Sequence, residues 1–148
     1  MDHLTKAGRS KVMSCIRSQN TRPELEVRKY LHARGYRFRI HAKHLPGKPD
    51  VVLPKYRLAV WIHGCFWHAH RCKVGERPSS NTEYWGPKLM RNVSRDVSNK
   101  RKLNKLGWNN FVIWECQILS PTKFARRLRT LERKIESLGG VRVKLCGK

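Results

Sequence analysis

The apolar run LAVWI, Leu58–Ile62, limits most strongly what this chain can fold into. A strand with one solvent-exposed face alternates apolar and polar side chains, whereas this run is apolar at every position. We therefore expect a strand over Arg57–Ile62 in the middle of a sheet that helices cover on both faces. The sequence predicts an α/β fold, a single domain with a central mixed β-sheet flanked by helices.

The remaining strands are expected on both sides of this run in the sequence. Tyr36–His41, Lys48–Leu53 and Trp108–Glu115 each combine apolar residues with turn signals at their ends. A long polar segment, Glu83–Leu106, precedes the last of them and is predicted to be a helix that Gly107 closes.

The first helix carries its own start signal. Thr21 is a favoured N-cap residue, Pro23 suits a first turn, and Glu24 lies three residues after the threonine. This spacing predicts a capping box, which would by itself explain Glu24. Gly35 should end the helix.

The two ends of the chain differ from the domain between them. Residues 1–20 are basic without a sustained apolar period, so we expect an arm that orders on its partner. The domain should span residues 21–138 and close with a helix that follows Ser120-Pro121. Gly139-Gly140 should end that helix and leave residues 139–148 as a basic tail, either a short edge strand or disordered. The expected core stripe of the helix is Phe124, Leu128, Leu131, Ile135 and Leu138.

The charge of the chain indicates a polyanionic partner. Lys and Arg total 33 against 10 acidic residues, a formal net charge of +23. No apolar run is long enough to span a bilayer, and the N-terminus lacks the apolar middle of a signal peptide, so we expect a soluble cytoplasmic protein. In that reducing setting the five cysteines favour metal binding over a disulfide framework.

A cluster of soft metal ligands follows the central strand directly. Cys65, His70 and Cys72 have the spacing C-x4-H-x-C, and Cys116 comes at the end of a later strand. Three thiols and one imidazole are typical of a closed, tetrahedral structural zinc site, provided that the two strands are neighbours. The alternative, ordinary buried cysteines, explains a lone thiol better than this group.

Asp50 and two histidines are the candidate catalytic residues. Asp50 begins a buried strand among basic residues, where a carboxylate can hold Mg²⁺ beside a phosphate. His63 and His68 follow the neighbouring strand, and imidazoles exchange protons near neutral pH. The alternatives are a strand-starting Asp50 and histidines that are spare zinc ligands or core residues. Glu115 should face away from the zinc, because strand alternation turns it opposite to Cys116.

Two large aromatic residues, Phe66 and Trp67, lie in the same loop. Rings held next to a nucleic-acid site can wedge between bases, and a mismatched pair opens more easily than a normal one. Met13 in the arm is a weaker candidate of the same kind. The alternative is that both rings pack into the core.

These motifs together resemble the very short patch repair (Vsr) mismatch endonucleases over about residues 5–118. The matching runs are LPGKPDVV, HGCFWHAHRC, NTEYW, RNVSRD, LGW and VIWEC. The resemblance implies a restriction-endonuclease-like fold and a monomeric, Mg²⁺-dependent enzyme with a structural zinc. It implies double-stranded DNA with a T·G mismatch, the product of 5-methylcytosine deamination, as the substrate, nicked on the 5′ side of the T.

The resemblance also implies roles for individual residues. Its catalytic set falls on Asp50, His63, His68, Glu24 and Asp96, with Asp96 near His63. The backbone carbonyl of Ile62 would share the Mg²⁺ with Asp50. The zinc ligands fall on Cys65, His70, Cys72 and Cys116. The DNA-binding positions are Phe66, Trp67, Met13, Lys88 and Asn92, of which Lys88 and Asn92 would read the mismatch from a groove.

Two other functional hypotheses remain beside the nuclease. A non-catalytic, zinc-stabilised DNA-binding module would use Asp50 and the histidines structurally. The E-x-K pattern usual in this nuclease superfamily is absent after Asp50, where Val60-Trp61-Ile62-His63 stands instead, and the resemblance implies that a histidine site replaces the lysine. A general RNA-binding protein is less favoured because no motif for a base-stacking sheet occurs.

Overall fold

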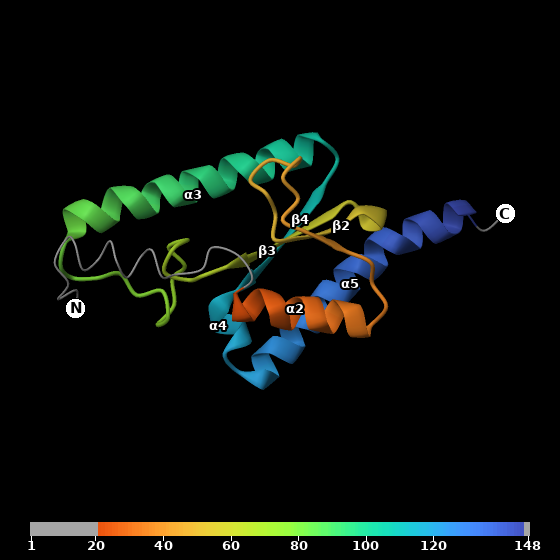
Figure 1. Cartoon of the computed structure of the whole chain (residues 1–148), viewed down its shortest axis with the longest axis horizontal. Helices are drawn as coiled ribbons and strands as arrows, with labels where there is room; N and C mark the ends of the chain where they lie inside the picture. The colour runs from red at the N-terminus through yellow and green to blue at the C-terminus, as the bar shows by residue number, and fades with distance from the viewer. Residues whose placement is uncertain (1–20, 147–148) are drawn as a thin grey trace.

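A four-stranded mixed sheet forms the centre of the molecule (Figure 1). The computed structural model describes the backbone of residues 21–146 and the side chains of residues 21–139. The strands lie in the order β1 (Arg39–Ile40), β2 (Val51–Leu53), β3 (Leu58–His63) and β4 (Asn109–Trp114). β1, β2 and β3 are antiparallel neighbours, whereas β3 and β4 run parallel.

The central position predicted for the LAVWI run is confirmed. β3 pairs with a strand on each side and is buried on both of its faces. The 3-10 turn η1 (Pro54–Tyr56) joins it to β2, and Arg57 with φ 48° makes the tight reversal. The parallel partner β4 ends beside the end of β3, where His63 is opposite Trp114.

Helices cover the two faces of the sheet separately. α2 (Arg22–Ala33) and α5 (Pro121–Cys146) pack on one face, where Val27, Leu31 and Leu131 meet Val60 and Ile113. α3 (Thr82–Lys105) covers the other face through Leu103, which packs with a group that also contains Ala42, Val52, Ala59 and Trp61. Figure 1 shows α3 on the opposite side of the sheet from α2 and α5. Within residues 21–146, no helix combines the length and apolarity that a bilayer span requires.

The strands before β3 are shorter than predicted. β2 begins at Val51 instead of Lys48, because Lys48 has a positive φ of 50° and Pro49 has no N–H to add to a ladder. β1 is limited to Arg39–Ile40 within the predicted Tyr36–His41, and His41, with φ 48°, ends it.

The last helix does not end at Gly139-Gly140, so that prediction is wrong. α5 continues through both glycines to Cys146. Gly139 permits close packing: a Cβ there would lie 2.8 Å from Cε1 of Tyr56 in η1. Glycine inside a helix costs about 1 kcal/mol relative to alanine, so it weakens a helix without terminating it.

Candidate active site and metal centre

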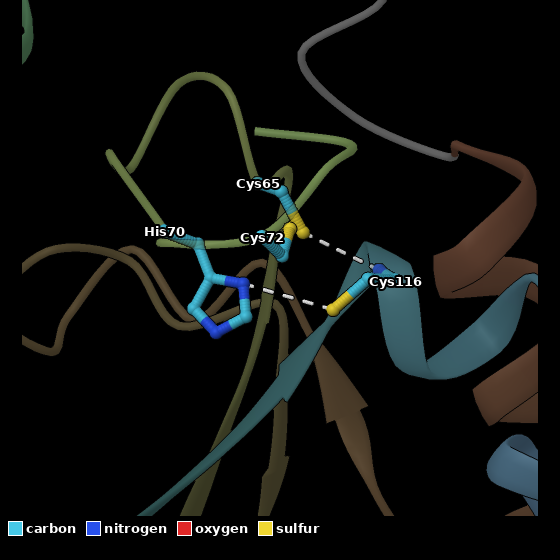
Figure 2. Close-up of side chains that lie close together, drawn as sticks. All are labelled: Cys65, His70, Cys72 and Cys116. Carbon is cyan, nitrogen blue, oxygen red and sulfur yellow. Dashed lines mark hydrogen bonds between the residues drawn. The ribbon is translucent and has the colours of Figure 1, made fainter. Parts of the chain in front are cut away.

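The four predicted soft ligands converge at the ends of β3 and β4. Figure 2 shows Cys65, His70 and Cys72 on the loop after β3, opposite Cys116 in the short helix α4 (Glu115–Ile118). One ligand atom from each of the four residues lies within 4.8 Å of all the others. The group can therefore hold a metal ion with three sulfurs and one nitrogen.

Two of the sulfurs already accept hydrogen bonds from backbone N–H groups. The Cys116 N–H donates to Sγ of Cys65 at 3.3 Å, and the Gly75 N–H donates to Sγ of Cys72 at 3.3 Å. Burial raises the pKa of the Cys65 thiol to about 12, so its deprotonation needs a cation at the site. A convergent thiol set with amide donors to sulfur suits a thiolate-bound metal.

The loop folds tightly around these ligands. The His70 N–H donates to the Cys65 carbonyl at 2.9 Å, and the Cys72 N–H donates to the His70 carbonyl at 3.0 Å. Gly75 closes the loop, since a Cβ there would lie 2.4 Å from the His70 carbonyl oxygen. Only glycine permits this approach without a shift of the backbone.

We call residues 64–75, which carry Cys65, His70 and Cys72, the metal loop. Glu115 lies beside this loop, which corrects the expectation that it faces away. β4 ends at Trp114, so Glu115 belongs to α4 and strand alternation does not apply to it. Its Oε2 accepts the N–H of Cys65 at 3.2 Å. The Trp114 N–H is bound by Oε1 of Gln117 at 2.9 Å, which turns the chain from strand into helix.

A second cluster contains His63, His68 and Asp96. Their ligand atoms also lie within 4.8 Å of one another. The two imidazoles are stacked, with ring centroids 3.7 Å apart, and Asp96 Oδ2 lies 2.5 Å from Nδ1 of His68. Asp96 is thus near His63 as expected, but its hydrogen bond is to His68. That bond leaves Nε2 of His68 to face a reacting group.

Burial decides the protonation state of His63. Desolvation, with a smaller effect of His68, lowers its pKa to about 3, so the ring is neutral at neutral pH. Its buried Nε2 has no hydrogen-bond partner among the described residues. Burial raises the pKa of Asp96, but the hydrogen bond with His68 and the electrostatic effects of His68, His63 and Lys100 together outweigh it, so the pKa is lower than usual.

Asp50 lies directly before β2 and reaches the backbone of β3. Its Oδ2 accepts the N–H of Ile62 at 2.7 Å. Burial raises the pKa of Asp50 to about 6; the Ile62 N–H lowers it, and the nearby carboxylate of Glu24 raises it further. The carboxylate therefore lies where a cation would stabilise its charged form.

Glu24 does not form the predicted capping box. Thr21 makes no side-chain cap hydrogen bond. Glu24 is only 3% exposed, and its Oε2 accepts a hydrogen bond from Arg28 at 2.9 Å and lies 3.8 Å from Nε2 of His41. The side chain is thus turned inward toward Asp50, whose pKa it raises.

Three aromatic rings gather where the metal loop meets the start of α3. Phe66 and Trp67 have centroids 5.0 Å apart, and Trp85 of α3 lies 5.0 Å from Phe66 and 6.0 Å from Trp67. The sequence did not single out Trp85, because its contact with Phe66 and Trp67 joins segments nearly twenty residues apart. We call Phe66, Trp67 and Trp85 the ring cluster.

Lys88 and Asn92 border the ring cluster. Nζ of Lys88 lies 5.8 Å from the ring centroid of Trp67 and 5.7 Å from that of Trp85. Asn92 Nδ2 donates to the Trp67 carbonyl at 2.9 Å, and Arg95 donates to its Oδ1. Asn92 therefore holds the loop that carries the rings. Met13 lies outside the described residues.

Histidines and a carboxylate that can move protons, on so basic a chain, indicate an enzyme that hydrolyses the phosphodiester bonds of a nucleic acid. Comparison with known proteins specifies the family. The sequence model described as DNA mismatch endonuclease Vsr matches residues 1–74. The chain therefore belongs to the Vsr family of DNA endonucleases, and its mixed sheet with flanking helices is the restriction-endonuclease-like architecture that the sequence predicted.

Relatives match over most of their own lengths. The type II nicking enzyme V.XorIIP of Xanthomonas oryzae pv. oryzae is 45% identical over 88% of this chain and 96% of the relative. The type II nicking enzyme V.NmeAIP of Neisseria meningitidis is 44% identical over 91% and 96%. The DNA mismatch endonuclease Vsr of Escherichia coli K12 is 40% identical over 80% and 76%.

Proposed function

We propose that this endonuclease nicks one strand of duplex DNA on the 5′ side of the T in a T·G mismatch. The observation that carries the proposal is the arrangement of Asp50, His63 and the His68–Asp96 pair beside a cluster of three aromatic rings. The names of the relatives, mismatch endonuclease and nicking enzyme, support the same activity.

Asp50 and the Ile62 carbonyl are the proposed Mg²⁺ ligands. The N–H of Ile62 already contacts the carboxylate, so the backbone of β3 is within its reach. When bound, Mg²⁺ would neutralise charge on the scissile phosphate. A raised pKa is typical of a carboxylate that lacks its cation, which supports this role for Asp50.

The histidines are proposed to move the protons of hydrolysis. Asp96 fixes the tautomer of His68 by binding Nδ1, so Nε2 can take a proton from the attacking water. The water oxygen bonds to phosphorus and the bond from phosphorus to the leaving sugar oxygen breaks. That oxygen takes a proton from the solvent, to which His68 afterwards returns the proton that it took. His63, neutral and stacked on His68, is placed to hydrogen-bond within the same site.

The thiol–imidazole cluster is proposed to bind a structural zinc. Three thiols and one imidazole form a closed set without an open position for a substrate. Zinc there would tie the loop that carries Phe66, Trp67 and His68 to the start of α4. The loop would then stay folded while Phe66 and Trp67 insert between base pairs. Insertion at a T·G pair would cost less than at a normal pair, because a mismatched pair opens more easily.

A strand-specific nicking assay tests the proposal. Duplexes with T·G or T·A at one position are incubated with and without Mg²⁺, using wild type, Asp50→Ala and the exposed-acid control Glu136→Ala. The expected product is one nick in the T strand of the T·G duplex, dependent on Mg²⁺, lost in Asp50→Ala and kept in the control. Equal nicking of both duplexes would contradict mismatch specificity. Binding without a nick in any lane would favour a non-catalytic, zinc-stabilised DNA-binding module over an enzyme.

A further inference from the structure

A basic stripe runs along α3, from the ring cluster to the end of the helix. It consists of residues spaced three, four or seven apart, which places them on one side of a helix: Lys88, Arg91, Arg95, Lys102 and Lys105. Ser98 fills the gap in the spacing. Four of the five cations are exposed, and Lys88 is half-buried. After Asp96, α3 carries no acidic residue.

The second half of the stripe borders an open groove on the same helix. The residues found to line it all belong to α3: Val93, Ser94, Val97, Ser98, Arg101, Lys102 and Lys105. Three cations and two hydroxyls are hydrogen-bond donors of the kind that contact phosphate oxygens in protein–DNA complexes.

We propose that this groove binds phosphates of the DNA duplex flanking the cleavage site, on one side of the mismatch only. The inference rests on the proposed function, because the ring cluster and Lys88 mark where the mismatch would lie. From Lys88 to Lys105 the helix rises about 25 Å. A duplex of the same length contains roughly 7 base pairs.

The composition of the groove favours DNA over an acidic protein. Interfaces between proteins have an apolar, uncharged centre. Here Val97 is 44% exposed, but Arg101, Lys102 and Lys105 line the same groove. All three cations are exposed, and no acidic residue follows Asp96 on the helix. Regularly spaced cations on a rigid rod fit a regularly spaced polyanion.

Binding to duplexes of different flank length tests the groove. Each duplex carries one T·G pair, and either the 5′ or the 3′ flank of the T strand is about 4 or about 14 base pairs long. These lengths lie below and above the roughly 7 base pairs that the helix would cover. Extending one flank should tighten wild-type binding, and extending the other should not. In Arg101→Gln/Lys102→Gln/Lys105→Gln that gain should disappear, and the slope of log K against log salt on the long duplex should fall by about 3.

The matched control removes the same charge from the opposite face of the sheet. Arg126→Gln/Arg129→Gln/Arg133→Gln alters three exposed arginines on α5 and should keep the flank dependence. An unchanged flank dependence in the α3 variant, or an equal loss in the α5 control, overturns the proposal; the former leaves an acidic protein as the occupant. Because the readout is binding and needs no cleavage, a chain that binds T·G duplexes with this one-sided flank dependence but fails to nick them would count against the proposed function alone.

Discussion

The imidazole of His70 lies flat on the indole of Trp114, with ring centroids 4.2 Å apart and planes 13° from parallel. Trp114 also lies 5.3 Å from the ring of His63. One tryptophan at the end of β4 therefore touches both a proposed zinc ligand and a proposed catalytic residue, and it links the metal loop to the reaction site.

Replacing Trp114 with leucine should weaken both sites together. Loss of the stacked ring frees His70 to turn, and loss of support around a metal ligand typically lowers metal affinity by roughly 10–100-fold. Zinc competition with a chelator measures the affinity, and the nicking rate is followed in the same preparations. Trp108→Leu, directly before the first residue of β4, is the control, and this variant should keep its zinc. Equal zinc affinity in wild type and Trp114→Leu would show that the stack does not orient the ligand.

Asp50→Asn should stabilise the metal-free protein at high pH. The pKa of Asp50 rises from 3.8 in the unfolded reference to about 6 in the fold, so the folded chain binds more protons between these values. Stability falls as pH rises through this window. Above it, the ionised carboxylate opposes folding, and Asn removes that penalty.

The expected gain is roughly 1–3 kcal/mol at about pH 8, shrinking toward zero at about pH 4. The free energies of unfolding of wild type and Asp50→Asn are measured in urea at both pH values, in buffer from which Mg²⁺ has been removed. If Asp50→Asn raises the free energy of unfolding equally at both pH values, the charge of the carboxylate is not the cause of the increase.

Gly75→Ala should disrupt the metal loop. The new Cβ would meet the His70 and Cys65 carbonyls at 2.4 and 2.9 Å, so the backbone must move, at a typical loss of about 1–3 kcal/mol. Thermal unfolding and bound zinc measured by metal analysis should both fall. Gly86→Ala in α3, where a Cβ has no neighbour within 4 Å, is the matched control and should be neutral or slightly stabilising.

His68 and Asp96 should act as one unit. His68→Ala and Asp96→Asn are each expected to slow nicking by roughly 10²–10⁴-fold while DNA binding is kept. The double variant should be hardly slower than His68→Ala, because Asp96 acts through the imidazole it binds. Single-turnover rates give the cycle, and losses that simply multiply would falsify the pairing.

Trp85→Leu should reduce the preference for mismatched DNA. Trp85 is only 7% exposed and packs against Phe66 and Trp67, so its replacement should loosen these two rings. Stacking of a base on an aromatic ring is worth about 1–3 kcal/mol, and poorly held rings should lose part of that contribution. A fluorescent base analogue beside the mismatch should show less unstacking with the variant than with wild type. If the fluorescence is identical, insertion of Phe66 and Trp67 does not depend on their packing against Trp85.

The sequence singled out the proposed catalytic residues more easily than the residues that they contact. Asp50, His63 and His68 stood out because acids are scarce and the histidines directly follow a central strand. The prediction that Cys116 completes the ligand set depended on β3 and β4 being neighbours, and the structure confirms that they are. Local patterns were wrong where tertiary contacts decide: Glu24 turns from Thr21 toward Arg28, and Glu115 starts a helix one residue after the strand ends.

Trp85 was missed because a tryptophan in an amphipathic helix is usually a core residue. Its role depends on Phe66 and Trp67, nearly twenty positions earlier in the chain, and no local spacing reveals that contact. The pairing of Asp96 with His68 instead of His63 likewise depends on how α3 lies across the sheet.

The parallel pairing of β3 with β4 also governs how the molecule assembles. Val60 faces Phe111 across the ladder, so no hairpin can form this contact and the chain must close a loop of about fifty residues. Such distant contacts form late in folding because their entropy must be lost before they stabilise anything. His63 meets Trp114, and Cys116 reaches the other three proposed zinc ligands, only when that loop closes. A chain that has not completed this step therefore lacks both the full zinc set and the ring that links it to the reaction site.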